Sequence, residues 1–341
     1  MNSVDVNFSN IDSSSLLILG NGFDLDLGYP TGYKDFVQNT NSPDNGLFPF
    51  LQKNKDYHNL GKFILKCTNV DKWYDLENIL AEYGKPIPKR STDLYLYGFS
   101  FSWILEWLYD WKNNLLDNHQ NINKDYLDYE RLVKSLVLYL KSIDLTNPNK
   151  SSVAAQLLKS LSVQLLRPQI YTFNYTDLSV IGRALGVNDI YFEHIHGNLK
   201  DDNIILGVGD YATLRHSYDF LYKTSNHNYH STNLFDALDT SENIFIFGLS
   251  LSQVDYPYFE DFFRNIAQGK YSKVKKYVRI FTYDDSSRSD ILRNLRKMNQ
   301  GMIKLNGYAD FDIIRTKNNV DKVKVKNIID KLSSKWNISD I

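Results

Sequence analysis

The amino-acid sequence predicts an α/β fold built on a Rossmann-like, mostly parallel β-sheet. Short apolar runs rich in β-branched and aromatic residues alternate with segments of helical periodicity, a pattern typical of βαβ units. The first run also leads directly into a glycine turn, as in α/β proteins that bind phosphates. Ligands of such sheets bind beyond the carboxyl ends of the strands. Functional residues are therefore expected where the strands end.

The predicted strands and helices follow in order along the chain. Strands are predicted at residues 16–19, 169–173, 190–195, 204–206, 244–247 and 277–282. Helices are predicted at residues 176–185, 256–266, 287–298 and 320–336. Several of the apolar runs end at glycine or at polar turn residues, which supports their assignment as strands.

A large helical insertion is predicted after the first strand. Between residue 36 and about residue 166 the pattern is almost entirely helical, most clearly at 73–83, 94–116, 126–143 and 153–166. We predict a nucleotide-binding domain of residues 1–40 and 167–341, and an inserted helical domain of residues 41–166. A helix-rich stretch at residues 211–240 is expected to form a lid, because insertions after strand ends commonly carry function.

Composition narrows the classes of function. The chain has 341 residues, 43% of them hydrophobic and 14% aromatic, enough to form a substantial core. The net charge of -1 provides no overall field that would attract nucleic acid or a membrane. The one cysteine, Cys67, excludes disulfides within the chain and a multi-cysteine zinc site. Because no signal peptide and no long apolar span is evident, we expect a cytoplasmic protein.

The first candidate segment is the glycine turn at residues 20–24, which reads GNGFD. Gly20 and Gly22 would let the backbone approach a phosphate and point its amides toward it. The dinucleotide fingerprint is not matched, because Leu25 stands at the position of its third glycine. Asp24 is an unusual residue in a phosphate-binding loop. A tight strand-to-helix turn without a ligand is an equally good interpretation.

Two further segments end predicted strands. In the first, Asn174 follows a strand, and Thr176 or Asp177 could cap the next helix; the alternative is that Asn174 only closes a turn. In the second, strand alternation predicts that His194 and His196 point to the same side. Without an evident third ligand this pair is a poor zinc site. His196, just before a glycine, could act as a general base, whereas His194 fits a structural role better.

The fourth segment leads from a predicted strand into Gly248 and Ser250. Gly248 would permit close approach of a ligand, and Ser250 could form a hydrogen bond with a ribose or a phosphate. The segment departs from the G-x-S-x-G motif, so a serine hydrolase is not expected. Helix capping by Ser252 or Asp255 is the alternative interpretation.

Together these segments resemble the sirtuin-like superfamily of NAD-consuming proteins. The sirtuin phosphate loop, G-A-G-I-S followed after three residues by G-I-P, has the spacing of residues 20–30. The sirtuin T-Q-N-I-D, H-G and G-x-S-L elements resemble residues 172–176, 196–197 and 248–251. Within this group the sequence is closest to the AbiH-type abortive-infection family, whose opening motif, ILGNGFDL followed by G-P-T-x-Y-x-D-F, resembles residues 17–36. Its W-x-D-x-E element resembles residues 73–77.

The resemblance implies an antiphage-defence enzyme that binds NAD and hydrolyses its nicotinamide–ribose bond. Asn174 would hold the ribose or the attacking water, His196 would be the general base, and Asp24 would orient the nicotinamide-side ribose. The other implied NAD-binding residues are Gly20, Asn21, Gly22, Phe23, Thr172, Gly248, Ser250 and Asp255. No metal is required by this chemistry. The single cysteine cannot form the four-cysteine zinc module of sirtuins, so peptide deacylation is not implied.

Two other functions remain open. The same pocket could serve a sensor that binds a nucleotide without turnover. A nucleic-acid-directed toxin would need clustered acids for a metal, and the candidates are Asp24, Asp26, Asp255 and Asp284. An enzyme that consumes NAD would also need control. We expect that control to come from homo-oligomerisation, or from a phage-derived or partner-protein trigger.

Overall fold

A computed structural model describes residues 15–39, 59–69, 75–86, 119–164, 167–271, 273, 275–299 and 302–333. The chain divides into two compact units. Unit 1 comprises residues 1–31, 143–201 and 231–341, and unit 2 comprises residues 32–142 and 202–230. A compact unit need not be a folding domain, so the predicted domain limits and the predicted lid stay predictions.

Unit 1 contains a six-stranded, all-parallel sheet with the strand order β3-β2-β1-β4-β5-β6. This confirms the predicted Rossmann-like α/β fold. The order reverses between β1 and β4, which places the topological switch point, where such sheets bind ligands, at the ends of these two strands. The strands are β1 (Ser15–Leu19), β2 (Gln169–Thr172), β3 (Glu193–His194), β4 (Asn243–Phe247), β5 (Lys276–Thr282) and β6 (Ala309–Arg315).

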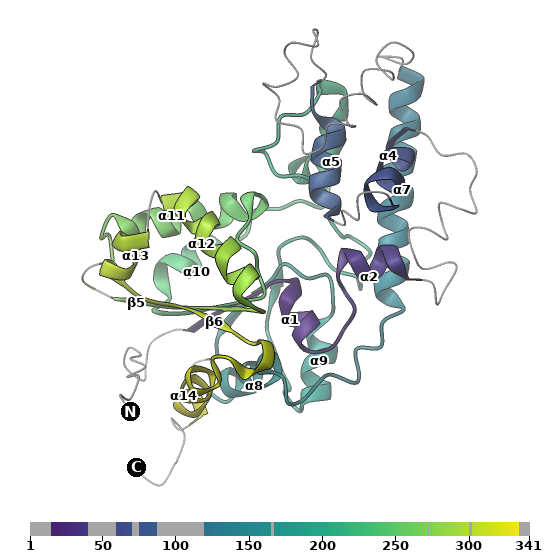
Figure 1. The fold of residues 1–341 in the computed structure, drawn as a ribbon. Helices are drawn as coiled ribbons and strands as arrows, with labels where there is room; N and C mark the ends of the chain where they lie inside the picture. Colours follow the sequence, from purple (N-terminus) through teal and green to yellow (C-terminus); the bar gives the residue numbers. More distant parts are fainter. Residues whose placement is uncertain are drawn as a thin grey trace. The chain divides into compact units, whose positions relative to one another are not determined.

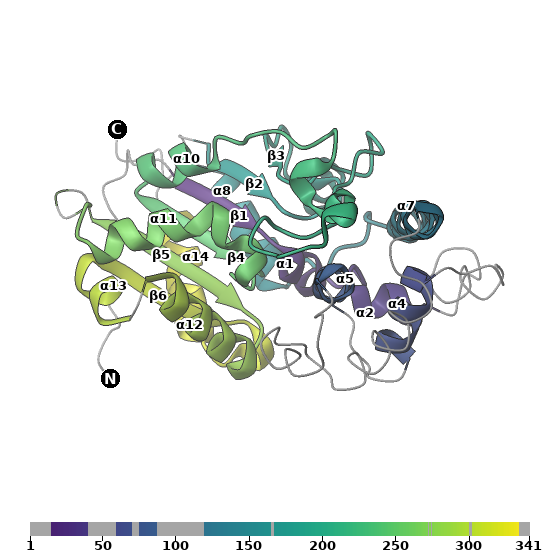
Figure 2. The same ribbon diagram turned by 90° about the horizontal axis from the view of Figure 1, so that it is seen from above.

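Helices cover both faces of this sheet (Figures 1 and 2). On one face lie α10 (Leu234–Thr240), α11 (Tyr256–Ala267), α12 (Asp285–Asn299) and α13 (Met302–Tyr308). On the other lie α1 (Asn21–Asp26), α8 (Val153–Ser162), α9 (Leu178–Leu185) and α14 (Lys322–Ser333). Strands covered on both sides become continuous apolar runs, and every residue of β1 and β4 is buried. Alternate side chains of β1 and β4 therefore enter two separate cores.

The strand predictions were wrong at two places. Residues 204–206 are buried but form no strand; this part of unit 2 has only a single bridge, between Val208 and Tyr222. A short apolar run shows that a segment is buried, not that it pairs. Conversely, β6 was not predicted, because Asp310 and Asp312 interrupt its apolar pattern. Arg279 forms an ion pair with Asp310, so the edge of the sheet tolerates this acid.

The helix predictions agree with the structure where it describes the chain. The predicted segments at 126–143, 153–166, 176–185, 256–266 and 287–298 correspond to α7 (His119–Lys141), α8, α9, α11 and α12. The predicted helix at 94–116 lies outside the described residues. Between β1 and β2 the described elements are all helical, as predicted. None of the described helices is long and apolar enough to cross a membrane.

Unit 2 combines α2 (Tyr33–Gln38), α4 (Asn59–Asn69), α5 (Leu76–Gly84) and α7 with two short 3-10 helices, His216–Leu221 and Lys223–Ser225. The buried carboxylate of Asp125 on α7 accepts hydrogen bonds from the Leu60 backbone N–H and from the hydroxyls of Tyr83 and Tyr218. One acid thus satisfies the start of α4 and connects four elements. Cys67 is buried in the same unit.

Candidate functional site

The candidate site lies in unit 1, where β1 and β2 end side by side. The backbone N–H of Phe173 donates a hydrogen bond of 2.8 Å to the carbonyl of Leu19, the last residue of β1. β1 then turns at Gly20 into the short helix α1, and β2 is followed by residues 173–177, which bend at Asn174 and Thr176 before α9 begins. Two segments far apart in sequence thereby deliver polar side chains to one place.

Asp24 on α1 is the buried centre of this group, with 1% of its surface exposed. The side-chain amide of Asn174 donates a 2.9 Å hydrogen bond to its Oδ1, and the hydroxyl of Thr176 donates a 2.8 Å bond to its Oδ2. Burial raises the pKa of Asp24 from 3.8 to about 7, although these two hydrogen bonds act in the opposite direction. The carboxyl group therefore exchanges its proton close to neutral pH.

Asn174 is held by hydrogen bonds on its backbone and its side chain. Its backbone N–H donates to Thr172 Oγ1 at 3.1 Å, and its backbone carbonyl oxygen lies 2.9 Å from His194 Nδ1. Its side-chain nitrogen donates to the Gly20 carbonyl at 3.1 Å and to Asp24. A carbonyl can only accept, so the Gly20 contact fixes which end of the amide is nitrogen. The side-chain oxygen is then the one group that Asn174 can offer to a ligand.

The glycine turn packs against the turn that follows β4. The N–H of Gly20 donates to the Phe247 carbonyl and the N–H of Gly22 donates to the Gly248 carbonyl, each at 2.9 Å. A Cβ atom at Gly22 would lie 2.5 Å from the Gly248 Cα, so the two backbones touch and no side chain fits between them. The backbone amides of Gly20 and Gly22, which were predicted to point toward a phosphate, are thus already used within the protein.

The other two turn residues have different environments. Asn21 is exposed, and its Oδ1 accepts a 2.6 Å hydrogen bond from Thr31 Oγ1. Phe23 is fully buried, with its ring packed edge-on against Phe247 at a centroid distance of 5.7 Å. Asn21 is therefore accessible to a ligand, whereas the side chain of Phe23 belongs to the core.

His194 and His196 were predicted to point to the same side, and the structure shows that they do not. The ring of His194 packs against Phe192, which lies against the core beneath α8 and α9. The ring of His196 packs against Phe173, which belongs to the core of the opposite face. Strand alternation fails here because β3 ends at His194. His196 is 5% exposed, and its Nε2 lies 3.3 Å from the hydroxyl of Tyr258 on α11.

After β4, the chain forms a helix start. Ser252 and Asp255 form a reciprocal capping box, which confirms the capping interpretation for both residues. Asp255 Oδ2 accepts hydrogen bonds from the Ser252 N–H at 2.9 Å and from Ser250 Oγ at 3.3 Å. The Ser250 hydroxyl thus donates to the residue that caps the helix.

The structure therefore unites Asp24, Asn174, Thr172 and Gly20 from the predicted set. It adds two residues, Thr176 and His194, that we did not select from the sequence. Strand alternation could not have found Thr176, because β2 ends at Thr172 and the chain bends at Asn174 and Thr176. Asp177, and not Thr176, caps α9, by accepting from the Ser179 N–H at 2.8 Å.

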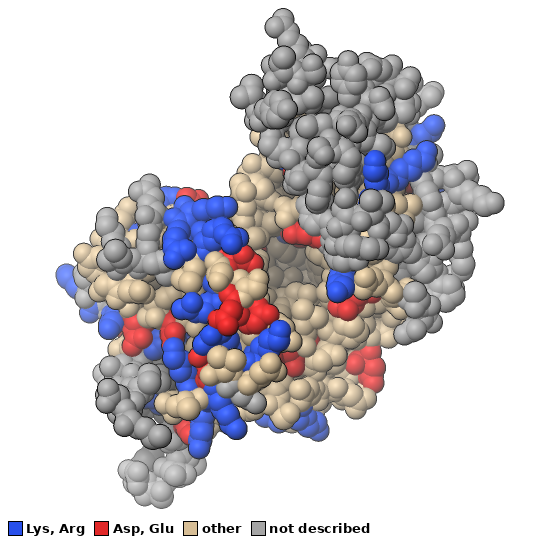
Figure 3. Space-filling model, viewed as in Figure 1, with Lys and Arg blue, Asp and Glu red and all other residues tan. Residues whose placement is uncertain are grey.

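Charges on the visible face of unit 1 are mixed, with Lys and Arg side chains lying among Asp and Glu (Figure 3). On α12, Arg293 pairs with Asp290 at 2.7 Å, and on α11, Arg264 pairs with Asp261 at 3.0 Å. Such interleaved pairs differ from the one-sign stripe that is typical of a nucleic-acid interface.

The acids considered for a metal have separate roles in the structure. Asp26 accepts a hydrogen bond from the Ala154 N–H at the start of α8, and Asp284 accepts one from the Ser287 N–H at the start of α12. Across the residues that the structure describes, no group of three or more His, Cys, Asp or Glu side chains is placed to hold a metal ion. The expectation that no metal is needed stays a prediction.

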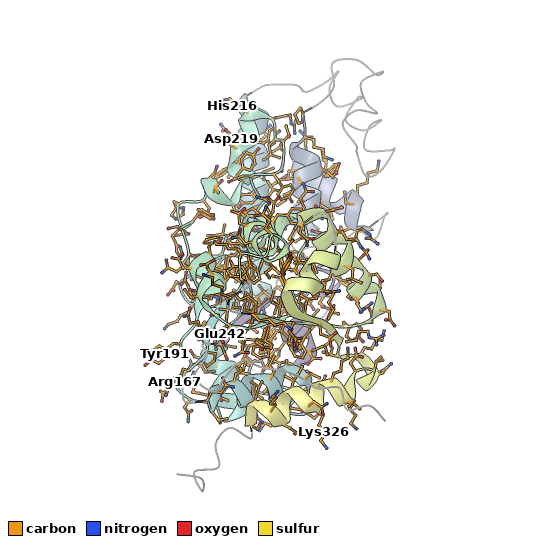
Figure 4. The ribbon with its side chains drawn as sticks, turned by 90° about the vertical axis from the view of Figure 1, so that its left-hand side faces the viewer. Arg167, Tyr191, His216, Asp219, Glu242 and Lys326 are labelled. Atoms are coloured by element: carbon orange, nitrogen blue, oxygen red, sulfur yellow. The ribbon has the colours of Figure 1, made fainter. Side chains whose placement is uncertain are left out.

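A separate hollow lies at the other end of β2, where the strand begins. Leu158, Pro168 and Ile170 contribute apolar surface, and Arg167 and Tyr191 lie at the rim. Figure 4 shows these two rim side chains next to one another, with the Arg167 guanidinium 5.8 Å from the centre of the Tyr191 ring. None of the predicted site residues lines this hollow, which faces away from the carboxyl ends of the strands.

The sequence matches a model of the protein family described as bacteriophage abortive infection AbiH, over residues 16–277. The match is longer than half of the chain and contains β1 from its second residue, β2, β3 and β4, with every residue of the site described above. No curated protein matches the sequence.

Proposed function

The chain belongs to the bacteriophage abortive infection family AbiH, and from this premise we propose that it acts in phage defence by hydrolysing NAD at the nicotinamide–ribose bond. The observation that carries the proposal is the environment of Asn174. Its backbone and its side-chain nitrogen are committed within the protein, while one side-chain oxygen remains for a ligand at the carboxyl ends of β1 and β2. A preorganised acceptor at that edge fits a ribose hydroxyl or an attacking water.

The reaction breaks the bond between the ribose C1′ and the nicotinamide nitrogen through an oxocarbenium-like state. Water adds to C1′, nicotinamide leaves with the bonding electron pair, and the water loses one proton. In the proposal, Asn174 accepts a hydrogen bond from the ribose or the water, and His196 takes up the proton. The products are nicotinamide, ADP-ribose and a proton, so atoms and charge balance.

In this proposal, Asp24 acts through Asn174, whose side-chain nitrogen donates a hydrogen bond to its carboxylate. When ionised, its carboxylate polarises the amide that donates to it, which makes the Asn174 oxygen a stronger acceptor. Its negative charge also favours the positive charge that develops on the ribose. Because Gly20 and Gly22 use their amides in the crossing with the β4 turn, we assign these glycines to close packing. The exposed Asn21 remains as a contact for the pyrophosphate.

The test is NAD consumption by the purified full-length chain, with release of nicotinamide measured in parallel. We expect Asn174→Ala and His196→Ala to lose turnover by roughly 100-fold or more, the size typical for loss of a general base or an oriented polar contact. Asn306→Ala, at an exposed asparagine on α13, is the matched control and should retain wild-type turnover.

Three outcomes separate the proposal from its alternatives. The proposal is supported if Asn174→Ala loses turnover and Asn306→Ala keeps it. Thermal stabilisation of the wild type by NAD without any turnover would instead favour the nucleotide sensor. If NAD neither stabilises the protein nor is consumed, the proposal of NAD as the ligand is wrong.

A further inference from the structure

The hydrogen bond between His194 and Asn174 determines where the imidazole carries its proton. Nδ1 of His194 lies 2.9 Å from the backbone carbonyl oxygen of Asn174. Because a carbonyl oxygen only accepts hydrogen bonds, Nδ1 must be the donor. In the neutral ring, the second nitrogen, Nε2, then carries no hydrogen.

This contact persists when the ring changes its charge. Burial lowers the pKa of His194 below 6.5, while the bond to Asn174 and the negative charges of Asp177 and Asp201 act in the opposite direction. Burial therefore favours the neutral ring. Protonation at lower pH adds a hydrogen at Nε2 and leaves the Nδ1–H bond to Asn174 intact.

The sheet gives His194 a fixed position from which to hold Asn174. His194 is paired with Thr172 in the parallel ladder between β2 and β3. Asn174 lies two residues beyond β2, where the ladder has ended. Two side chains of the paired strands thus fix the backbone of Asn174. The His194 imidazole bonds to its carbonyl, and the Thr172 hydroxyl accepts from its N–H.

We propose that His194 is a positioning residue, which as an imidazole protonated at Nδ1 fixes the backbone of Asn174 so that its side-chain oxygen faces the ligand. Its effect on turnover rests on the proposed function, whereas the geometry that it fixes does not. The role differs from that of His196, whose ring contacts Phe173 and the hydroxyl of Tyr258.

Two amide substitutions separate the nitrogens of the ring. His194→Asn places an amide N–H close to the position of Nδ1 and can still donate to Asn174. His194→Gln places its amide nearer to the position of Nε2 and does not. We expect the Asn variant to keep a kcat near that of the wild type with the same pH profile. The Gln variant should lose kcat by roughly 10- to 100-fold with a smaller change in KM, as for misplaced catalytic groups elsewhere.

Two kinetic results would overturn the inference. If both variants lose kcat equally, an amide N–H at the Nδ1 position does not restore turnover, so donation to Asn174 is not what the ring contributes. If both variants keep the wild-type kcat, the contact has no positioning effect.

A spectroscopic measurement tests the geometry without any reference to NAD. The ¹⁵N shifts of the His194 ring in the full-length protein at about pH 8 distinguish the two neutral tautomers. The Nδ1–H tautomer supports the inference, and the Nε2–H tautomer overturns it. In His194→Gln, but not in His194→Asn, the carboxyl signal of Asp24 should also move, because Asn174 connects the two residues. If the wild type does not hydrolyse NAD, the proposed function fails, and this measurement still decides the role of His194.

Discussion

At the scale of single residues, Asp24 is the most unusual group of the site. Its two described hydrogen-bond donors, Asn174 and Thr176, are both uncharged. A buried carboxylate without a cation beside it is costly to ionise, which is why burial raises its pKa to about 7. Asp24, an unusual residue in a phosphate-binding loop, is thus a proton-binding group that is hydrogen-bonded to Asn174.

Asp24 should make folding stability depend on pH. Between about pH 4 and pH 7 the folded protein keeps a proton on Asp24 that the unfolded chain releases, since its pKa rises from 3.8 to about 7 on folding. This contribution is fully present below pH 4 and is lost as the pH rises through 7. Asp24→Asn resembles the protonated acid, because its carbonyl can accept from Asn174 while its amide donates to Thr176. We expect the variant to be more stable than the wild type at pH 8 by about 1 to 3 kcal/mol.

The measurement is the free energy of unfolding in urea from pH 5 to pH 8 for both proteins. Other titrating groups affect both curves equally, so the difference between the curves isolates Asp24. The wild-type curve should fall relative to the variant by up to roughly 1.4 kcal/mol per pH unit. Parallel curves would show that Asp24 does not hold a proton in the folded state.

At the scale of elements, the crossing of the two glycine turns joins the ends of β1 and β4. A Cβ atom at Gly248 would lie 2.4 Å from the Cα of Gly22, and Gly248 also has a φ of +68°. Gly186, the C-cap of α9, has a φ of +79°, but no atom lies within 4 Å of the position that a Cβ would take there. The pair separates the cost of the backbone conformation from the cost of the clash.

Alanine substitutions at these two glycines should therefore differ in their effect. We expect Gly186→Ala to cost about 1 kcal/mol of unfolding free energy, the usual penalty of a left-handed conformation. Gly248→Ala should cost at least roughly 2 kcal/mol more, because backbone atoms cannot move aside as a flexible side chain can. Urea unfolding of the two variants checks this, and equal losses would contradict a direct contact between the turns.

A second contact between elements is made by the buried lysine at the start of β5. Lys276 donates hydrogen bonds to the backbone carbonyls of Leu238, Asp239 and Ser241 at and just beyond the end of α10. It thereby satisfies acceptors that a helix end leaves without partners. Burial lowers the pKa of Lys276 from 10.5 to about 8.

Replacing Lys276 should lower the free energy of unfolding. Lys276→Met keeps the length of the side chain but leaves these carbonyls without their donor, so we expect a loss of about 2 to 4 kcal/mol. Lys326→Met is the control, since Lys326 is an exposed lysine on the outer side of α14 (Figure 4). Thermal unfolding at pH 7 compares the two, and similar midpoints would show that the buried contacts add nothing.

At the scale of the whole molecule, the proposed function predicts a cellular outcome. Cells that carry the wild-type protein should lose NAD soon after phage infection and release few phage. Cells that carry Asn174→Ala should keep their NAD and release phage as cells without the protein do. NAD and phage titre are measured in the same cultures, with the Asn306→Ala variant as the control. Protection by the Asn174 variant would show that defence does not depend on this site.

Much of the fold could be predicted because the central strands are continuous apolar runs. β1 and β4 are buried on both faces, so nearly all of their residues are apolar. The edge strand β6 escaped prediction because its acids are compensated by cations from other elements, such as Lys324 for Asp312. For the site, the residues that follow strands were identified, but the face on which His196 packs was not.

By itself, the sequence determined the parallel sheet, the helical segment after the first strand, and the residues that stand at the strand ends. Only the tertiary structure decided how those residues act on one another. Asp24 and Asn174 are 150 positions apart, and the two glycine turns are also distant in the chain, so no local pattern specifies either contact. Whether an amide is free for a ligand, a carboxyl group keeps its proton, or an imidazole donates from Nδ1 depends on partners that the fold alone brings within hydrogen-bond distance.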